Sequence, residues 1–214
     1  MRIVAVAECG THATFAARLA VLDAGESTIA GPLAPAVGAG MLVLADRGFG
    51  GSYELFDQFA ASGADLGWRV KRNAALPVIE RLADGSFASE LPRGAERSAL
   101  PVRVVEYQVD NPGRPQHEDN IYSLVTTILE PDRRAGAVVY AQRWEFETAL
   151  DELKTHQRGA RIVLGSKTAD GVRQEAWGMP CVHYAIWALM CRAAEEGEVD
   201  PDRVSFTRSM RAAA

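Results

Sequence analysis

Apolar and polar positions in the first 75 residues alternate in a way that predicts strands and helices in turn. Residues 2–10 form an almost continuous apolar run with β-branched members, typical of a buried strand. The Ala-rich segment 12–23 predicts a helix closed by Gly25. A second strand is expected at 41–45, a helix at 52–63 with Ser52 as N-cap and Gly63 as its stop, and a third strand from 65 to 72. This order predicts a sheet with parallel neighbours and helices packed on it.

The pattern changes after this region. Short alternating stretches between residues 76 and 130 are separated by turn-forming segments such as "DNPGRPQHEDN", which predicts antiparallel strands. An amphipathic helical segment follows at 172–196, in which Pro180 is expected to start or kink the latter half. The last residues show little periodicity. We therefore predict an α/β core over 1–75, a β-rich insertion over 76–130, a helical completion of the core over 131–196 and a tail over 197–214.

One predicted helix, "YAQRWEFETALDELK", carries functional side chains along a single line. With about 100° per residue, Arg143, Glu147 and Lys154 all fall within about 60° of Tyr140. The apolar residues of the segment form a neighbouring stripe of the kind that packs on a core. This helix is therefore expected to have one buried edge beside a rim that bears an aromatic hydroxyl, a carboxylate and two cations.

Composition and charge narrow the classes of protein. The 214 residues are 48% hydrophobic and 24% charged, ordinary values for a folded domain or a tight pair of domains. Three cysteines without paired spacing favour a reducing compartment, and no apolar run is long enough for a membrane span, so a cytoplasmic protein is expected. The net charge is −5, but residues 133–173 contain eight Lys or Arg and five Asp or Glu, a local +3 that leaves −8 elsewhere. Positive charge is thus concentrated around the helix just described.

Two carboxylates stand where chemistry is expected. Asp46 follows the predicted strand at 41–45, and strand ends of α/β sheets commonly carry functional groups. Glu147 lies on the rim of the helix. If the fold brings them together, they can bind Mg²⁺, which prefers carboxylate oxygens, water and phosphate. With cations nearby, the pattern suggests phosphoryl transfer at a nucleic-acid backbone.

A family resemblance strengthens this interpretation. The segment from Tyr140 to Lys154 matches, without a gap, the Tyr-x2-Arg-x3-Glu-x6-Lys signature of DDE transposases of bacterial insertion sequences. "LADRGF" resembles the strand that bears the second Asp of their catalytic triad. Similarity extends through "AECGTHA", "RGARIVLGSK" and "VRQEAWG", and so covers nearly the whole chain.

The resemblance implies a fold, a chemistry and partners. It implies an RNase H-like α/β core with a mixed sheet and flanking helices, and Asp46 and Glu147 as two of three carboxylates that bind Mg²⁺ or Mn²⁺. Tyr140, Arg143 and Lys154 would contact double-stranded DNA at transposon ends. A homodimer on DNA, acting on ends and target, is implied by the family alone. Arg158 projects on the same face of an ideal helix and is our addition to this track.

The chain departs from the family pattern at the first Asp of the triad. The 45 residues before Asp46 hold only Glu8, Asp23 and Glu26 as acidic residues, none in a convincing strand-end context. We therefore expect an N-terminally truncated catalytic core that is inactive or impaired on its own. The alternative is a product that binds DNA, or a full-length transposase, without cutting.

Taken one at a time, the same residues also fit roles outside transposase chemistry. Asp46 alone suits a turn, and Glu147 alone suits a solvated helix position or a partner for Arg143. Cys9 and His12 suggest either half of a zinc site or a thiol hydrolase, although a thiol at the end of an apolar strand is more often buried and inert. Cys181 and His183 are expected in the core. Only the joint pattern of the helix and "LADRGF" favours transposase chemistry over these roles.

Overall fold

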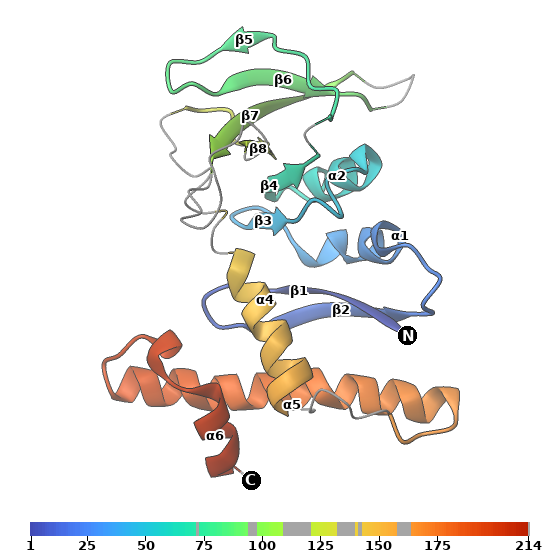
Figure 1. Ribbon diagram of the computed structural model, residues 1–214, viewed down its shortest axis with the longest axis vertical. Coiled ribbons are helices and arrows are strands. Elements are labelled where there is room, and N and C mark those ends of the chain that lie inside the picture. Colours follow the sequence, from blue (N-terminus) through green and yellow to red (C-terminus); the bar gives the residue numbers. More distant parts are fainter. Residues whose placement is uncertain are drawn as a thin grey trace. The chain divides into compact units, whose positions relative to one another are not determined.

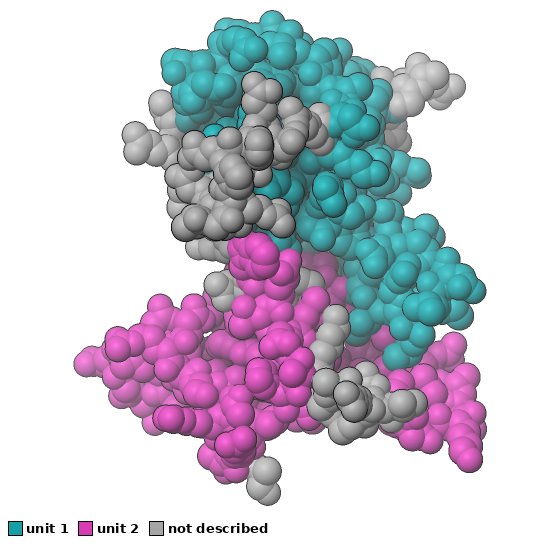
Figure 2. Space-filling view, viewed as in Figure 1, with its two compact units in different colours: residues 1–4, 20–143 teal, residues 5–19, 144–214 magenta. Residues whose placement is uncertain are grey.

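The structure is a computed structural model that describes residues 1–71, 73–93, 98–108, 121–131, 140, 143–157 and 164–213. The chain divides into two compact units, drawn in different colours in Figure 2. Unit 1 comprises residues 1–4 and 20–143, and unit 2 comprises residues 5–19 and 144–214. Within the described residues, no helix is both long and apolar enough to cross a membrane.

A six-stranded mixed sheet is the centre of unit 1 (Figure 1). Its order is β3-β4-β8-β7-β6-β5. The strands are β3 (Leu42–Ala45), β4 (Asp65–Val70), β5 (Glu80–Arg81), β6 (Phe87–Leu91), β7 (Leu100–Gln108) and β8 (Ile121–Thr126). β3 and β4 are parallel, whereas all other neighbours are antiparallel. The predicted strands before Asp46 and after Gly63 are confirmed, and the β-rich segment continues the same sheet through the pairing of β8 with β4.

Helix α2 (Tyr53–Ala60) lies in the connection between the two parallel strands, which need a crossover rather than a tight turn. The predicted cap is confirmed, because the Ser52 hydroxyl accepts the N–H of Leu55 at 3.2 Å. Gly63 ends the turn after α2 with φ of +86°, a conformation that favours glycine. Phe56 and Phe59 pack edge-on against Trp68 of β4, with ring centroids 5.1 and 5.5 Å apart. The short helices α1 (Glu26–Ala30) and η1 (Gly31–Ala36) precede β3.

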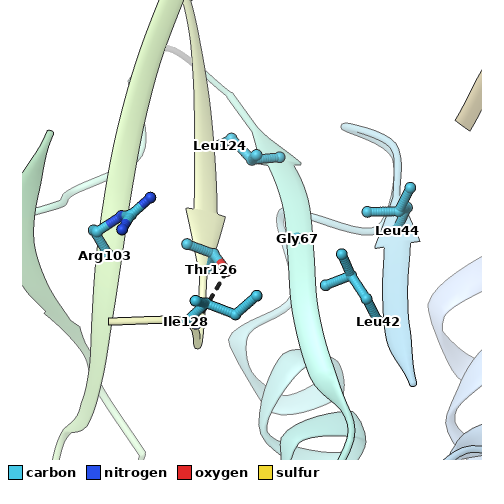
Figure 3. A pocket seen from close by; sticks show the side chains of 7 residues that line it. All are labelled: Leu42, Leu44, Gly67, Arg103, Leu124, Thr126 and Ile128. Carbon is cyan, nitrogen blue, oxygen red and sulfur yellow. Dashed lines mark hydrogen bonds between the residues drawn. The ribbon is translucent and has the colours of Figure 1, made fainter. Parts of the chain in front are cut away.

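The opposite face of this sheet carries an apolar hollow. Trp68 packs against α2 on one face of the sheet. Because successive positions of a strand alternate between faces, Gly67 belongs to the other face. The hollow is lined by Leu42, Leu44, Gly67, Arg103, Leu124, Thr126 and Ile128 (Figure 3). Arg103 is buried and its guanidinium donates to the backbone oxygen of Glu130. The aliphatic lining and the paired arginine indicate a packing feature of the sheet.

The helix predicted at 12–23 is wrong. Residues Thr14–Ala20 form strand β2, which pairs with β1 (Arg2–Ala7) in a separate two-stranded sheet. The N–H of Glu8 donates to the Ala13 oxygen at 3.0 Å across the turn, and His12 has φ of 52°, which an α-helix cannot continue. Alanine favours helices, but intrinsic propensity is only a weak determinant of structure, and pairing with β1 outweighs it here. The first strand is confirmed as an element, but it lies outside the six-stranded sheet.

Helices form most of unit 2. They are α4 (Arg143–Asp151), the π-helical turn η3 (Glu152–Gln157), α5 (Ala169–Glu196), η4 (Pro201–Arg203) and α6 (Phe206–Ala213). The core of this unit contains Ile186, Trp187 and Met190 from α5 and Phe206 from α6. Pro180 lies inside α5, so it does not start a new helix, and the kink that was predicted as the alternative stays a prediction. The expectation that the tail has little periodicity is wrong, because it folds into η4 and the amphipathic helix α6.

Candidate active site

Asp46 follows β3 directly and is held by its own turn. Its Oδ1 accepts the N–H of Gly48 at 2.7 Å, and its backbone oxygen accepts the N–H groups of Phe49 and Gly50, each at 3.2 Å. Gly50 is needed for this turn, because a Cβ there would lie 2.1 Å from the backbone oxygen of Arg69 on β4. The Asp46 carboxylate remains exposed. The turn thus presents the Asp46 carboxylate to solvent at the end of β3, a parallel strand.

Tyr140 lies beside this strand end. Its hydroxyl donates to the backbone oxygen of Ala45 at 3.2 Å, although 95 residues separate the two. The side chain is buried, and this burial raises the pKa of Tyr140 to about 12. The phenol therefore stays protonated and remains a donor at physiological pH. This contact between Tyr140 and the Asp46 strand end was not predicted, and the DNA contact predicted for Tyr140 stays a prediction.

Arginine and tyrosine side chains surround Tyr140. The Arg143 guanidinium carbon lies 5.7 Å from the Tyr140 ring centroid. On the sheet, Arg69 lies 4.0 Å over the ring of Tyr122. Tyr107 links the two pairs, with ring centroids 5.6 Å from Tyr122 and 6.4 Å from Tyr140. Two cations on aromatic faces thus lie in the same cluster as the Asp46 strand end.

Arg69, Tyr107 and Tyr122 are missing from the sequence prediction. Their signal was the strand alternation: Arg69 lies between the buried Trp68 and Val70 and must point to the other face of β4. Finding the tyrosines needed the register of the antiparallel strands, in which Tyr107 is opposite Tyr122. Register follows from non-local pairing and cannot be obtained from spacing along one strand.

Glu147 lies on α4 and is exposed. It belongs to unit 2, whereas Asp46, Tyr140 and Arg143 belong to unit 1, so its meeting with Asp46 stays a prediction. Lys154 lies in η3, a π-helical turn whose hydrogen bonds run from residue i to i+5. The prediction placed Lys154 by α-helical geometry, and that geometry ends at Asp151. The predicted DNA contact Arg158 lies outside the described residues.

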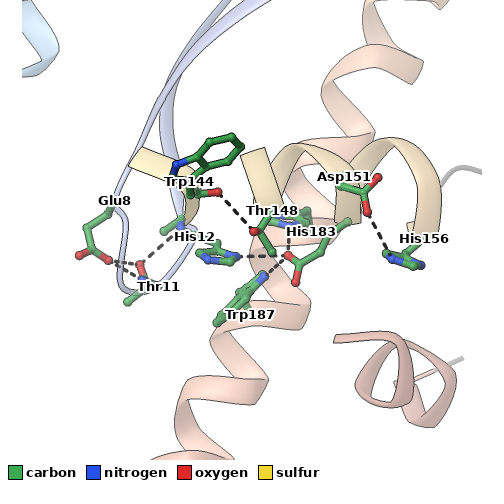
Figure 4. Close-up of polar contacts among 11 residues, drawn as sticks. Glu8, Thr11, His12, Trp144, Thr148, Asp151, His156, His183 and Trp187 are labelled. Atoms are coloured by element: carbon green, nitrogen blue, oxygen red, sulfur yellow. Dashed lines mark hydrogen bonds and ion pairs between the residues drawn. The ribbon is translucent and has the colours of Figure 1, made fainter. Parts of the chain in front are cut away.

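A buried carboxylate that sequence reasoning missed lies at the start of η3. Glu152 accepts hydrogen bonds from His12, His183 and Trp187 on its Oε2 (Figure 4). Burial by itself raises the pKa of Glu152, but the three hydrogen bonds outweigh it and lower the pKa to about 2. The sequence offered no clear signal, because Glu152 stands beside Asp151 in a charged part of the helix. The prediction of a buried His183 is confirmed, whereas Cys181 is exposed.

The structure also bears on the metal and thiol hypotheses. Among the described residues, no three His, Cys, Asp or Glu side chains are grouped closely enough to hold a metal ion. Exposed carboxylates such as Asp46 are nonetheless of the chemical type that Mg²⁺ prefers. His12 is engaged by Glu152 at 3.3 Å, and this contact orients its Nδ1 toward the core of unit 2. Because His12 is hydrogen-bonded to Glu152, the structure argues against His12 as the base of a thiol hydrolase.

The mixed sheet with a carboxylate at a strand end and flanking helices is the architecture of an RNase H-like α/β protein. Residues 10–184 match the family described as "Transposase DDE domain", and because this covers more than half of the chain, the protein belongs to that family. The resemblance predicted from the signature helix is thereby confirmed.

A curated relative supports the same family. The chain is 25% identical over 221 residues to "Transposase InsG for insertion sequence element IS4" of Escherichia coli (strain K12). The similarity covers 98% of this chain but 48% of the relative, so the chain spans about half the length of the curated relative it matches.

Proposed function

We propose that this chain supplies part of the catalytic core of a DNA transposase that cleaves phosphodiester bonds and transfers strands at transposon ends. The observation that carries the proposal is the Asp46 strand end, where an exposed carboxylate is fixed by backbone hydrogen bonds and lies in a cluster with Tyr140 and two arginines. Family membership supports transposase chemistry for such a site.

In this proposal, Asp46 and Glu147 are two of the carboxylates that hold Mg²⁺ or Mn²⁺. Such an ion, when bound, activates the attacking oxygen and stabilises the leaving oxygen in phosphoryl transfer. The Gly48 N–H donates to the Asp46 carboxylate and the Gly50 N–H closes the turn on the Asp46 backbone oxygen, which reduces the ordering cost of binding a ligand. Glu147 contributes an exposed carboxylate from α4.

The cationic residues have a separate role in positioning DNA. Arg143, Lys154 and Arg158 neutralise phosphate charge and hold the duplex without reading its sequence. Tyr140 fixes the Asp46 strand end through Ala45 and places its ring beneath Arg143. Double-stranded DNA at the transposon ends and at the target is the proposed partner, and a homodimer on DNA is proposed from the family.

The first experiment is Mn²⁺-dependent nicking of a supercoiled plasmid, because it requires no knowledge of the element ends. We expect Asp46→Asn and Glu147→Gln to reduce nicking by about 100-fold or more, since each removes a metal-binding carboxylate. Asp23→Asn, at an exposed acidic residue outside the proposed site, is the matched control and should nick like the wild type. DNA affinity should change little in all three.

The assay is run in parallel on an N-terminally extended version of the chain. Nicking by the extended version alone would assign part of the metal site to residues outside these 214. DNA binding without nicking by either version would contradict the proposed catalysis and favour a binding protein. Nicking that is unchanged by Asp46→Asn would contradict the assignment of that residue.

A further inference from the structure

Glu152 is a charged side chain in a position where packing alone would favour an apolar one. The residue is 8% exposed, and its hydrogen-bond partners are 3% exposed or less. A buried carboxylate is costly unless it is fully hydrogen-bonded. Here one oxygen, Oε2, receives three contacts: 2.8 Å from Trp187 Nε1, 3.1 Å from His183 Nε2 and 3.3 Å from His12 Nδ1.

The chemistry of these groups fixes the direction of each hydrogen bond. An ionised carboxylate only accepts, so both imidazoles must present an N–H to it. His183 therefore carries a proton on Nε2. Its Nδ1 is buried without a hydrogen-bond partner among the described residues, so Nε2 is the ring nitrogen that holds Glu152. The arrangement is a carboxylate with three converging donors.

The three donors come from segments far apart in the sequence. His12 belongs to the turn between β1 and β2, and His183 and Trp187 belong to α5. Ring contacts hold the donors in place, with His12 4.2 Å from Trp187 and His183 5.1 Å from Phe206. At the other end of η3, the Gln157 amide donates to the Met179 oxygen of α5 at 2.9 Å. The turn η3 is therefore anchored at both ends within unit 2.

Anchoring η3 determines the rotation of α4 about its axis. Glu147 precedes Glu152 by five residues, which corresponds to about 140° around an α-helix. When Glu152 points into the core, Glu147 must point outward, as its exposure shows. The π-helical turn begins at Glu152, and such turns are sparse and persist where the surroundings impose them. A leucine at 152 would fill space but would not select one rotation.

We propose that Glu152 is the positioning residue for Glu147: the three hydrogen bonds that it accepts set the rotation and register of α4, so that the Glu147 carboxylate points away from the core of unit 2 and is presented for metal binding. This inference rests on the proposed role of Glu147 as a metal ligand. It assigns to His12, His183 and Trp187 a shared task, which is to hold the oxygen of Glu152 rather than to bind substrate.

The test is titration of the 214-residue chain with Mn²⁺ alone, with free ion measured by electron paramagnetic resonance. Glu147→Gln should weaken Mn²⁺ binding by about tenfold or more, and Glu152→Gln should weaken it by about tenfold although it touches no metal. Asp151→Asn is the matched control. It removes one negative charge next to Glu152 in the sequence, from a side chain that is 61% exposed. It should bind Mn²⁺ within about twofold of the wild type. Thermal melting establishes that each variant is folded at the assay temperature.

The outcomes separate the two ideas. If Glu147→Gln weakens binding and Glu152→Gln behaves like Asp151→Asn, the positioning role is overturned while the proposed function stands. If the 214-residue chain binds no Mn²⁺, the same variants are titrated in the N-terminally extended version. No Mn²⁺ binding by either version, or Glu147→Gln that binds as tightly as the wild type, overturns both. If Glu152→Gln does not fold, Trp187→Phe removes one donor and keeps most of the packing, and it should weaken Mn²⁺ binding by about threefold. Unchanged binding in folded Trp187→Phe would then overturn the positioning role.

Discussion

Asp46 and Glu152 are both carboxylates at the end of a secondary-structure element, yet they are held in opposite ways. Asp46 is exposed, and its partners are backbone N–H groups no more than four residues away. Glu152 is buried, and its partners are side chains 31, 35 and 140 residues away. The difference indicates that a carboxylate free to meet a ligand is oriented by its own turn, whereas one that organises the fold is oriented by distant segments.

The largest effect is expected at the turn that holds Asp46. Gly50→Ala places a methyl group 2.1 Å from the Arg69 backbone oxygen, so the turn or β4 must move. We expect a loss of about 4 kcal/mol in the free energy of unfolding, measured by urea denaturation. Gly51→Ala is the matched control, since its added methyl meets nothing within 4 Å. Equal stability of the two variants would show that the Asp46 turn does not depend on the close approach to β4.

The second effect concerns Glu152 and acid. Its pKa is lowered from 4.5 to about 2 in the folded protein, so the ionised form is favoured by folding. The stabilisation is complete above pH 4.5 and is lost as the pH falls toward 2, by about 3 kcal/mol in total. Urea denaturation of the wild type and Glu152→Gln at several pH values measures it. The difference between the two should shrink on acidification, and a constant difference across this range would contradict the lowered pKa.

A smaller effect is expected for Tyr140→Phe. The variant removes the hydroxyl that bonds to the Ala45 oxygen and leaves the ring contact with Arg143. We expect a loss of about 1 kcal/mol in the free energy of unfolding, together with weaker Mn²⁺ binding if the strand end loosens. Tyr184→Phe, at a tyrosine that is 54% exposed, is the control. Removal of that hydroxyl should leave both measurements unchanged.

The smallest effects should come from the helix caps, one in each unit. Ser52 caps α2 and Thr168 caps α5, each through a side-chain oxygen that accepts a backbone N–H at 3.2 Å. Replacement by Ala should cost about 1 kcal/mol at either site, because the capping contact is local and similar in both. Thermal melts of Ser52→Ala and Thr168→Ala measure it. A much larger loss at one site would show that the cap also supports packing around it.

Contacts with close neighbours explain part of what the sequence predicts. The cap at Ser52 and the turn at Gly63 depend on neighbours in the chain, and these predictions are confirmed. β3 was predicted from its apolar run, although it pairs with the more distant β4. β2 is mispredicted because its strand state depends on β1, which overrides the helix preference of its alanines. The helical tail after residue 197 packs on α5 through Phe206, and its helix α6 is amphipathic, a pattern that the sequence prediction missed.

The candidate site divides in the same way. The signature from Tyr140 to Lys154 lies within one short segment, so the family can be identified from sequence and is confirmed by the family match. Arg69 and Tyr122 join the Asp46 cluster only through strand register, and Glu152 receives its role from three distant residues. No spacing rule along the chain reports such contacts. The sequence therefore predicts the family better than it predicts the residues that support the site.

The hydrogen bond from Tyr140 to Ala45 has a consequence for the time course of folding. Its two ends are 95 residues apart, so this contact requires closure of a very long loop, and long-range contacts are slow to form. The turn at Asp46 can form as soon as β3 and β4 pair. The hydrogen bond from Tyr140 to Ala45 can form only after residue 140 has been synthesised. On the ribosome, the carboxylate is thus presented early and its surroundings are completed late.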